Sequence, residues 1–439
     1  MEDGERVGMT PLADSRRSVS AAWSEGLEAL LCRFALTRMP AVALAVVLPS
    51  GAEVALHPGP IRYRIHLRTR TCFARFVSGG SAAFGDLYRD GLLTVDGDLV
   101  SLLVEANRMA EPTADRRTVL SRLSARWRRV DGRRAARNAR RHYALSSEFF
   151  GAWLDADRTY TCAWFPHDGM TLAEAQAAKM ELICRKLRLG RGESVVEAGC
   201  GWGALALYMA RHYDARVRAF NVSGEQVAWA RERAKAEGLD RRVEFVVADY
   251  RDIEGCADAF VSVGMLEHVG PRHYRQFGAV VSRVIGERGR ALVHTIGRVR
   301  PMPTDRWIER RVFPDGYTPS PAEISRAFEP NDLAVLHMEN LRADYALTLA
   351  HWLRNFDAAV AGPLAGYDPK FLRTWRLYLA ASQAAFLTGW AQLYQFLLTS
   401  RANTSFRGPH SVLAMPGPAG PEAEVVGRAT SVGDRGLQR

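Results

Sequence analysis

Hydrophobic and polar positions follow two periods in the second half of the chain. From about residue 190, apolar runs such as SVVEAG, RVRAFNVS, VEFVVAD, AFVSVGM and RALVHTIG are separated by segments with helical spacing, such as ALALYMARHY and GEQVAWARERAKAEG. Continuous apolar runs are typical of strands covered on both faces, and their alternation with helices is typical of βαβ units. The pattern therefore predicts a doubly wound α/β domain with a parallel sheet, which we place at residues 142–400.

The N-terminal region has a different pattern. Residues 21–38 have helical spacing, and residues 42–69 are strand-like, with a Pro-Ser-Gly turn at 49–51 and alternation in IRYRIHLRT. The segment that follows predicts short helices broken by Gly79-Gly80 and by Gly97. We expect a small α+β domain at residues 20–110, after a disordered N-terminus at residues 1–19.

Charge is concentrated between these two regions. The chain carries a net charge of +11, and much of the excess lies in an arginine-rich linker, residues 111–141. This charge favours a polyanionic partner such as nucleic acid or an anionic membrane, although the arginine run could equally be a solvated surface. The Gly- and Pro-rich residues 401–439 predict a disordered tail.

Composition narrows the class of protein. With 439 residues and 47% hydrophobic residues, the chain can bury large cores without disulfides, and its six scattered cysteines are interpreted as thiols with no metal-ligand spacing. The apolar stretch at residues 39–49 is shorter than the roughly 20 residues that a membrane-spanning helix needs. The opening MEDGERVG lacks a signal pattern, so we expect a cytoplasmic protein.

The strongest local motif is a glycine loop after an apolar run. Glu197 is followed by Gly199, Gly201 and Gly203, in VVEAGCGWG. Glycines allow a ligand close to the backbone, and the next helix offers its N-terminus. A dinucleotide site would place its third glycine one residue later and would carry an acid after the second strand, where this chain has Phe220-Asn221-Val222-Ser223. The loop instead resembles that of class I S-adenosylmethionine methyltransferases.

Further motifs make the resemblance more specific. They are HYALSSEFFGAWLDADRTYTCAWF, AGCGWGALALYMARHY, FNVSGEQVAWARERAKAEGL, ADYRDI, FVSVGMLEHVGPRHY, LVHTIG, WIERRVFPDGYTPS, ADYALTLAHWLRNF and LYLAASQAAF. Together, over about residues 50–400, they resemble the cyclopropane-fatty-acyl-phospholipid synthases and the related mycolic acid cyclopropane synthases. The resemblance implies a Rossmann-like methyltransferase domain. It also implies methyl transfer from S-adenosylmethionine to a cis double bond of a phospholipid acyl chain, with a bicarbonate ion as the base that allows a cyclopropane ring to close.

The resemblance also implies site residues and partners. Around the bicarbonate ion it places Glu267, His294, Tyr345, Cys162 as a hydrogen-bonding residue, and the backbone of Ile296. For S-adenosylmethionine it implies Tyr160, Thr161, Glu197, Gly199, Cys200, Gly201, Gly203, Asn221, Val222, Gln226, Asp249 and Tyr250, with Asp249 toward the adenine. No metal is implied. The partner would be an anionic phospholipid membrane with unsaturated chains, bound peripherally at its inner face, rather than nucleic acid, and a homodimer is compatible with the family.

Several positions and outcomes stay open. Ala144, Ser147 and Ser382 replace residues that are common in the family. The same chemistry could end in a methylene or methyl branch, or act on a natural-product alkene, and a non-catalytic lipid- or nucleic-acid-binding module is a third reading. Seven aromatic residues are equally compatible with pocket walls or with plain core: Trp352, Phe356, Trp375, Phe386, Trp390, Tyr394 and Phe396.

Overall fold

The computed structural model describes residues 42–55, 59–109 and 147–406. The predictions for the N-terminus, the helix at 21–38, the arginine-rich linker and Ala144 lie outside these ranges, as does the tail beyond residue 406. Within them, no helix combines the length and the apolar character that crossing a membrane requires.

A seven-stranded sheet forms the centre of the larger unit. Its order is β10-β11-β9-β8-β5-β6-β7, and the five strands from β9 to β7 run parallel, whereas β11 is antiparallel to β9 and to β10. The strands are β5 (Ser194–Ala198), β6 (Arg216–Asn221), β7 (Val243–Val247), β8 (Ala259–Val263), β9 (Arg290–Gly297), β10 (Leu333–Asn340) and β11 (Gln392–Ser400).

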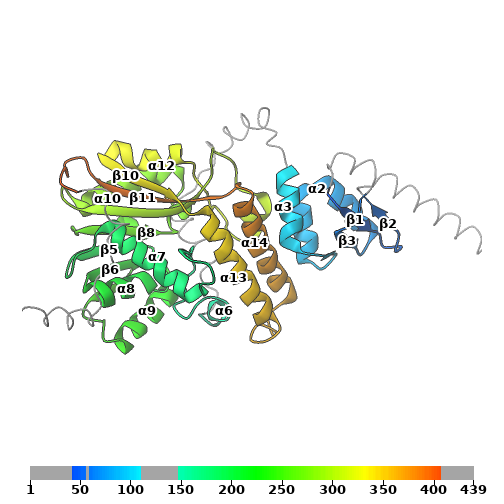
Figure 1. The fold of residues 1–439 in the computed structure, drawn as a ribbon, viewed down its shortest axis with the longest axis horizontal. Helices are drawn as coiled ribbons and strands as arrows, with labels where there is room; N and C mark the ends of the chain where they lie inside the picture. Colours follow the sequence, from blue (N-terminus) through cyan, green and yellow to red (C-terminus); the bar gives the residue numbers. More distant parts are fainter. Residues whose placement is uncertain (1–41, 56–58, 110–146, 407–439) are drawn as a thin grey trace, which may run out of the picture.

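Helices cover both faces of this sheet (Figure 1). One face carries α7 (Leu172–Leu187), α8 (Ala204–Tyr213) and α9 (Gly224–Ala236), and the other carries α10 (Tyr274–Ile285) and α12 (Pro321–Phe328). Successive residues of β5 separate the two cores, since Val195 packs with the first set of helices and Val196 with the second. A strand buried on both sides has apolar residues at every position, and the predicted doubly wound α/β class is confirmed.

The smaller unit contains a four-stranded sheet in the order β2-β1-β3-β4. Its elements are β1 (Leu44–Val47), β2 (Glu53–Ala55), β3 (Tyr63–Leu67), α2 (Arg70–Arg89), β4 (Leu93–Asp96) and α3 (Leu99–Met109). The expected break at Gly79-Gly80 is a kink in α2, where Gly80 has φ 57°. The expectation of helix before Gly97 was wrong, because Gly91 and Gly97 turn the chain with positive φ and the residues between them pair with β3.

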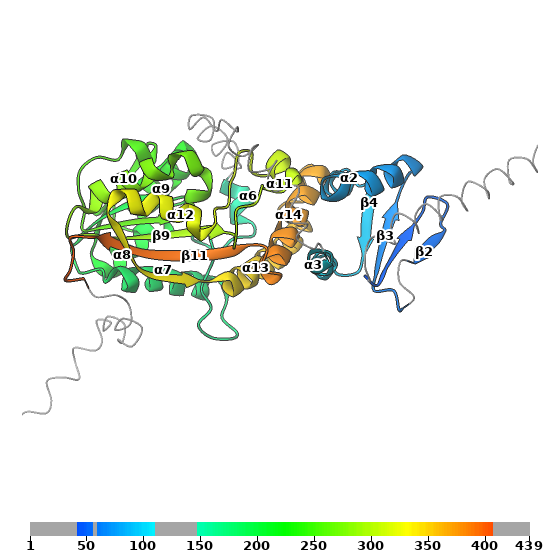
Figure 2. The same cartoon turned by 90° about the horizontal axis from the view of Figure 1, so that it is seen from above.

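Two long helices connect the units. α13 (Arg342–Val360) and α14 (Pro369–Leu387) lie between the large sheet and the helices α2 and α3, as Figures 1 and 2 both show. α14 packs on α2 and α3, and the short helix α11 (Arg306–Arg311) also packs on α2. Arg311 pairs with Asp86 at 3.0 Å, and Asp305 accepts a hydrogen bond from Ser81 at 2.9 Å.

The contact between α2 and α11 depends on a residue without a side chain. A Cβ atom at Gly85 would lie 2.4 Å from the ring of the buried Trp307. We predict that Gly85→Ala lowers the free energy of unfolding by about 1–3 kcal/mol, because overpacking outweighs the small gain in helix propensity. Thermal unfolding measures the effect, and Gly366→Ala, where the added Cβ meets open space, is the control. Equal unfolding temperatures for the two variants would contradict this packing.

Candidate active site

A cavity of about 160 Å³ lies where β5, β6 and β7 end. The glycine loop after β5 forms one wall, and its three glycines have positive φ. A Cβ atom at Gly203 would lie 2.7 Å from the ring of Phe245, so this glycine is required by packing. A Cβ atom at Gly201 would meet nothing within 4 Å, so the loop leaves space for a ligand there.

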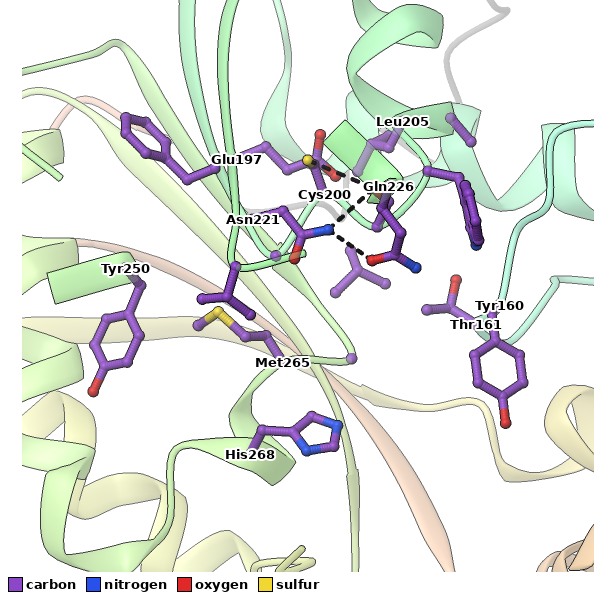
Figure 3. Close-up of a pocket in the computed structure, with 18 of the residues that line it drawn as sticks. Tyr160, Thr161, Glu197, Cys200, Leu205, Asn221, Gln226, Tyr250, Met265 and His268 are labelled. Carbon is purple, nitrogen blue, oxygen red and sulfur yellow. Dashed lines mark hydrogen bonds between the residues drawn. The ribbon is translucent and has the colours of Figure 1, made fainter. Parts of the chain in front are cut away.

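Almost all of the predicted cofactor residues come together around this cavity. Its lining includes Tyr160, Thr161, Glu197, Gly199, Cys200, Gly201, Asn221, Val222, Gln226, Asp249 and Tyr250. Gly203 precedes α8 and does not line it. Figure 3 shows the amides of Asn221 and Gln226 facing each other, and Asn221 Nδ2 donates to Gln226 Oε1 at 2.8 Å and to the Gly201 carbonyl at 3.2 Å. Asn221 therefore braces the glycine loop.

Two buried ionisable groups meet at the inner wall. Glu197 is only 3% exposed, and burial raises the pKa of its carboxyl; its Oε2 atom has no hydrogen-bond partner in the described part of the chain. Lys179 of α7 is equally buried, which lowers the pKa of its ammonium group, and its Nζ donates to Thr161 Oγ1 at 2.9 Å. An unpartnered carboxylate oxygen beside an open loop is suited to accept hydrogen bonds from ligand hydroxyls.

Lys179 is a site residue that sequence analysis missed. It lies on the buried side of α7 together with Gln176, whose Nε2 donates to the Thr161 carbonyl at 2.8 Å. Polar residues three positions apart on the apolar side of a helix are a detectable signal, because burying them without partners is costly. Arg251 was also missed: its guanidinium holds the carboxylate of Asp249 through two hydrogen bonds of 2.8 Å. Asp249 thus lines the cavity as half of an ion pair.

A second cavity, of about 120 Å³, contains the residues expected around the bicarbonate ion. Cys162, Glu267, His294, Ile296 and Tyr345 all line it. Glu267 Oε1 accepts a hydrogen bond of 2.6 Å from the Ile296 backbone N–H. Glu267 Oε2 and His294 Nε2 are buried, and neither has a hydrogen-bond partner among the described residues. Thr318, which also lines this cavity, has a buried hydroxyl without a hydrogen-bond partner in the described part of the chain, so three lining residues carry polar atoms that a ligand could satisfy.

Burial also sets the charge of these groups. It raises the pKa of Glu267 from 4.5 to about 7, and it lowers the pKa of His294 well below its ordinary value. The buried thiol of Cys162 has a raised pKa and donates to the Ala163 carbonyl at 2.9 Å, so it is a neutral group here. The remaining lining is largely aromatic and aliphatic, including Ile308, Phe313, Tyr378 and Leu393.

The two cavities share a wall. Tyr160, Thr161, Gly264 and His268 line both of them. A ligand in the first cavity and a ligand in the second would therefore meet across the same four residues, which is what transfer of a group between two bound molecules needs.

Two of the three departures from the family pattern, Ser147 and Ser382, lie in the described ranges and make hydrogen bonds there. Ser147, at the start of α6 (Ser147–Gly151), accepts a hydrogen bond from Arg158, whose guanidinium lies 4.6 Å from the Trp229 ring centroid. Ser382 hydrogen-bonds Tyr378, which lines the second cavity, but Ser382 does not line it. None of the seven aromatic residues that were compatible with wall or core lines either cavity, and all except Trp390 are buried, so the structure places these six in the core.

Comparison with known proteins identifies the class and the family. Residues 130–396 match the family described as mycolic acid cyclopropane synthetase, and the chain belongs to it. It is an S-adenosylmethionine-dependent methyltransferase of the cyclopropane synthase family. It is 35% identical to the cyclopropane-fatty-acyl-phospholipid synthase of Escherichia coli K12, over 83% of this chain and 94% of that protein.

Two further comparisons show how widely the likeness extends. A probable fatty acid methyltransferase of Pseudomonas putida is 34% identical over 82% of this chain and 94% of its own length. The solved structure of the cyclopropane synthase MmaA2 from Mycobacterium tuberculosis has a TM-score of 0.57 and 27% identity, over 60% of this chain and 97% of that one. The recognition of the family and of its Rossmann-like fold is confirmed, whereas the roles of the individual site residues stay predictions.

The open space at Gly201 predicts how the loop responds to a side chain. Gly201→Val adds a branched side chain at φ 53° beside the cavity, so we expect S-adenosylmethionine affinity to fall about tenfold or more. Calorimetric titration measures this. Gly192→Val is the matched control, because Gly192 also has a positive φ and open surroundings but does not line the cavity. Unchanged affinity in the Gly201 variant would contradict the placement of the cofactor.

The raised pKa of Glu267 predicts a pH-dependent stability. Between pH 4.5 and about 7 the folded chain holds a proton that the unfolded chain has released, so its stability falls as pH rises through this window. Glu267→Gln removes this slope and keeps an acceptor for the Ile296 N–H. Across that window, the unfolding free energy of the wild type relative to the variant should drop by about 3 kcal/mol. Urea unfolding at several pH values tests this, and parallel curves would contradict it.

Proposed function

We propose that the chain transfers the methyl group of S-adenosylmethionine to a cis double bond of an unsaturated phospholipid acyl chain and closes a cyclopropane ring. The observation that carries the proposal is the pair of adjoining cavities. The second has a largely apolar lining and includes Glu267 and His294, whose Oε2 and Nε2 atoms have no hydrogen-bond partner in the described part of the chain. A methyl donor fits beside the glycine loop, and an alkene fits against aromatic and aliphatic walls. An alkene is a weak nucleophile, so alignment in a dry pocket is the main requirement.

We infer that the second chamber also holds a bicarbonate ion. When bound, this ion would supply the base that takes a proton from the newly added methyl group. The chain fits such an anion, because Glu267, His294 and Thr318 each carry a buried polar atom without a partner among the described residues, and a carboxyl with a pKa near 7 repels an anion less than an ordinary carboxylate would. Glu267 can accept a proton from the ion after the transfer, since its pKa is close to neutral pH.

Unpartnered polar atoms and open space also support the proposed contacts to S-adenosylmethionine. The unpartnered Glu197 Oε2 is suited to the ribose hydroxyls, and the open approach at Gly201 is suited to the amino-acid part of the cofactor. The cation that forms when a methyl group joins the alkene would lie near aromatic rings at the shared wall, including Tyr160 and His268. The smaller unit is proposed to bring the enzyme to an anionic membrane surface, which the net charge of +11 of the whole chain favours.

A second outcome has support from the relatives. The tuberculostearic acid methyltransferase UfaA1 of Mycobacterium tuberculosis is 36% identical over 60% of this chain and 65% of its own length. The names of this relative and of the probable fatty acid methyltransferase of Pseudomonas putida support a methyl- or methylene-branched acyl chain as the alternative product. The cation would be the same, and only the site of proton loss would differ: loss elsewhere leaves an unsaturated, methylene-type branch, and a saturated methyl branch would also require a hydride donor supplied by another protein.

The test is product analysis with defined lipids. Purified full-length chain is incubated with S-adenosylmethionine and phosphatidylglycerol vesicles that carry cis-monounsaturated chains, with and without bicarbonate. We expect a gain of one CH₂ with strongly upfield ring protons, and a loss of turnover after bicarbonate is stripped that returns on re-addition. Vinylic or branched-methyl signals would replace the proposed product by the alternative, and turnover independent of bicarbonate would overturn the proposed base.

The same assay tests Glu267. Glu267→Gln should lower turnover about 100-fold or more while cofactor affinity stays nearly unchanged, because the amide cannot accept a proton. Glu181→Gln is the control, since Glu181 accepts hydrogen bonds from Tyr208 and Tyr213 and lines neither cavity. Unchanged turnover in the Glu267 variant would remove this residue from the proposed mechanism.

A further inference from the structure

A row of polar side chains crosses three adjacent strands beside the second cavity. Glu339 of β10 is the cross-strand partner of Gln395 of β11, and Gln395 is the cross-strand partner of His294 of β9. Directly opposed residues project on the same face of a sheet, so register alone brings these three together. Lys186, in the last turn of α7, lies against the row: its Nζ donates to Gln395 Oε1 at 2.6 Å and pairs with Glu339.

Lys186 determines which way the Gln395 amide points. An ammonium group can only donate hydrogen bonds, so it requires the amide oxygen of Gln395 on its side. The amide nitrogen must then face the other way, and it lies 2.9 Å from His294 Nδ1. A flipped amide would direct its own N–H groups at the ammonium and leave both donors unpaired.

The amide in turn determines where the histidine carries its proton. An NH₂ group can only donate, so His294 Nδ1 must accept and carries no proton. His294 is 2% exposed, and both its burial and the charges of Lys179 and Lys186 lower its pKa, so the ring is neutral. A neutral imidazole has a single N–H, which leaves Nε2 as its position.

We propose that Lys186 and Gln395 are positioning residues that hold His294 as the Nε2–H tautomer, so that it presents a hydrogen-bond donor to an anion in the second cavity. Nε2 is the ring atom that has no partner in the described ranges, and His294 lines that cavity. In this state His294 Nε2 cannot take a proton, so it holds the anion and leaves proton transfer to the ion and Glu267. The identity of that anion rests on the proposed function; the tautomer does not.

The tautomer can be measured without substrate. In the full-length chain labelled with ¹⁵N-histidine, long-range ¹H–¹⁵N correlations distinguish a protonated ring nitrogen from a bare one, and His294→Gln identifies the signals. We expect a proton on Nε2 and none on Nδ1 in the wild type. Gln395→Glu offers a carboxylate to Nδ1, so a proton should appear there. Lys186→Met frees the Gln395 amide to turn, so a mixture of tautomers should appear.

Turnover and a control complete the experiment. Gln395→Glu should lower kcat about tenfold or more with unchanged cofactor affinity. Thr399 lies on the same strand as Gln395 and donates a buried hydrogen bond to the Gly289 carbonyl. Thr399→Val removes this bond and should leave both the His294 signals and kcat unchanged. If Lys186→Met does not fold, the Gln395→Glu variant alone tests the proposal, because the new carboxylate at position 395 still pairs with Lys186.

The outcomes separate this inference from the proposed function. A wild-type proton on His294 Nδ1, or variants whose His294 signals match those of the wild type, would overturn the role of Lys186 and Gln395. A wild type with the expected tautomer that converts no unsaturated lipid would overturn the proposed function, and it would support the tautomer assignment on its own.

Discussion

Desolvation of ionisable groups at the carboxyl ends of the central strands is the constraint on which this site depends. A buried charge without a partner costs several kcal/mol, so each such group must be paired, neutralised or satisfied by a ligand. Lys186 is paired with Glu339, and Asp249 with Arg251. Glu267 and His294 are instead shifted toward their neutral forms. The described part of the chain leaves Glu197 Oε2, Glu267 Oε2 and His294 Nε2 without partners, and under the proposed function ligands would satisfy them.

The segment from Tyr160 to Ala163 is held in place by hydrogen bonds to buried polar side chains. It forms part of the wall between the cavities, and side chains of two helices hold it in place. Gln176 and Lys179 of α7 bind the carbonyl and hydroxyl of Thr161, and Thr348 of α13 accepts from the Ala163 N–H at 3.0 Å. Under the proposed function, a wall fixed in this way would set the separation between methyl donor and acceptor before either binds, which is where preorganisation lowers a barrier.

Sequence patterns predicted the parts of this architecture that are local. The glycine loop was visible because Gly199, Gly201 and Gly203 follow an apolar run, and the sheet was visible because doubly covered strands are apolar throughout. The strand β4 could not be predicted from the sequence pattern, because its four residues become a strand only by pairing with β3. The seven aromatic residues were ambiguous since helical spacing is the same for a core and for a pocket wall.

The interactions that escaped prediction are those set by register between distant strands. Nothing in the segments around His294 and Gln395 marks them as partners, since they lie 101 residues apart and meet only because β11 runs back beside β9. The buried lysines of α7 could be recognised as unusual, but not which groups they contact. Long-range pairing is the information that a single sequence carries most weakly, and this site is built from it.

The contact between the two units places the smaller one near the second cavity rather than the first. α2 packs on α11, and the segment around α11 supplies Thr304, Ile308, Phe313 and Tyr317 to the wall of the second cavity. Asp86 and Ser81 of α2 anchor both ends of this helix through Arg311 and Asp305. α2 therefore braces a helix next to the wall of the second cavity, whereas Gly203 of the glycine loop packs against Phe245 of β7 and Ala230 of α9. Under the proposed function, the smaller unit thus supports the acceptor side of the reaction, whereas the methyl donor would lie against the glycine loop of the larger unit.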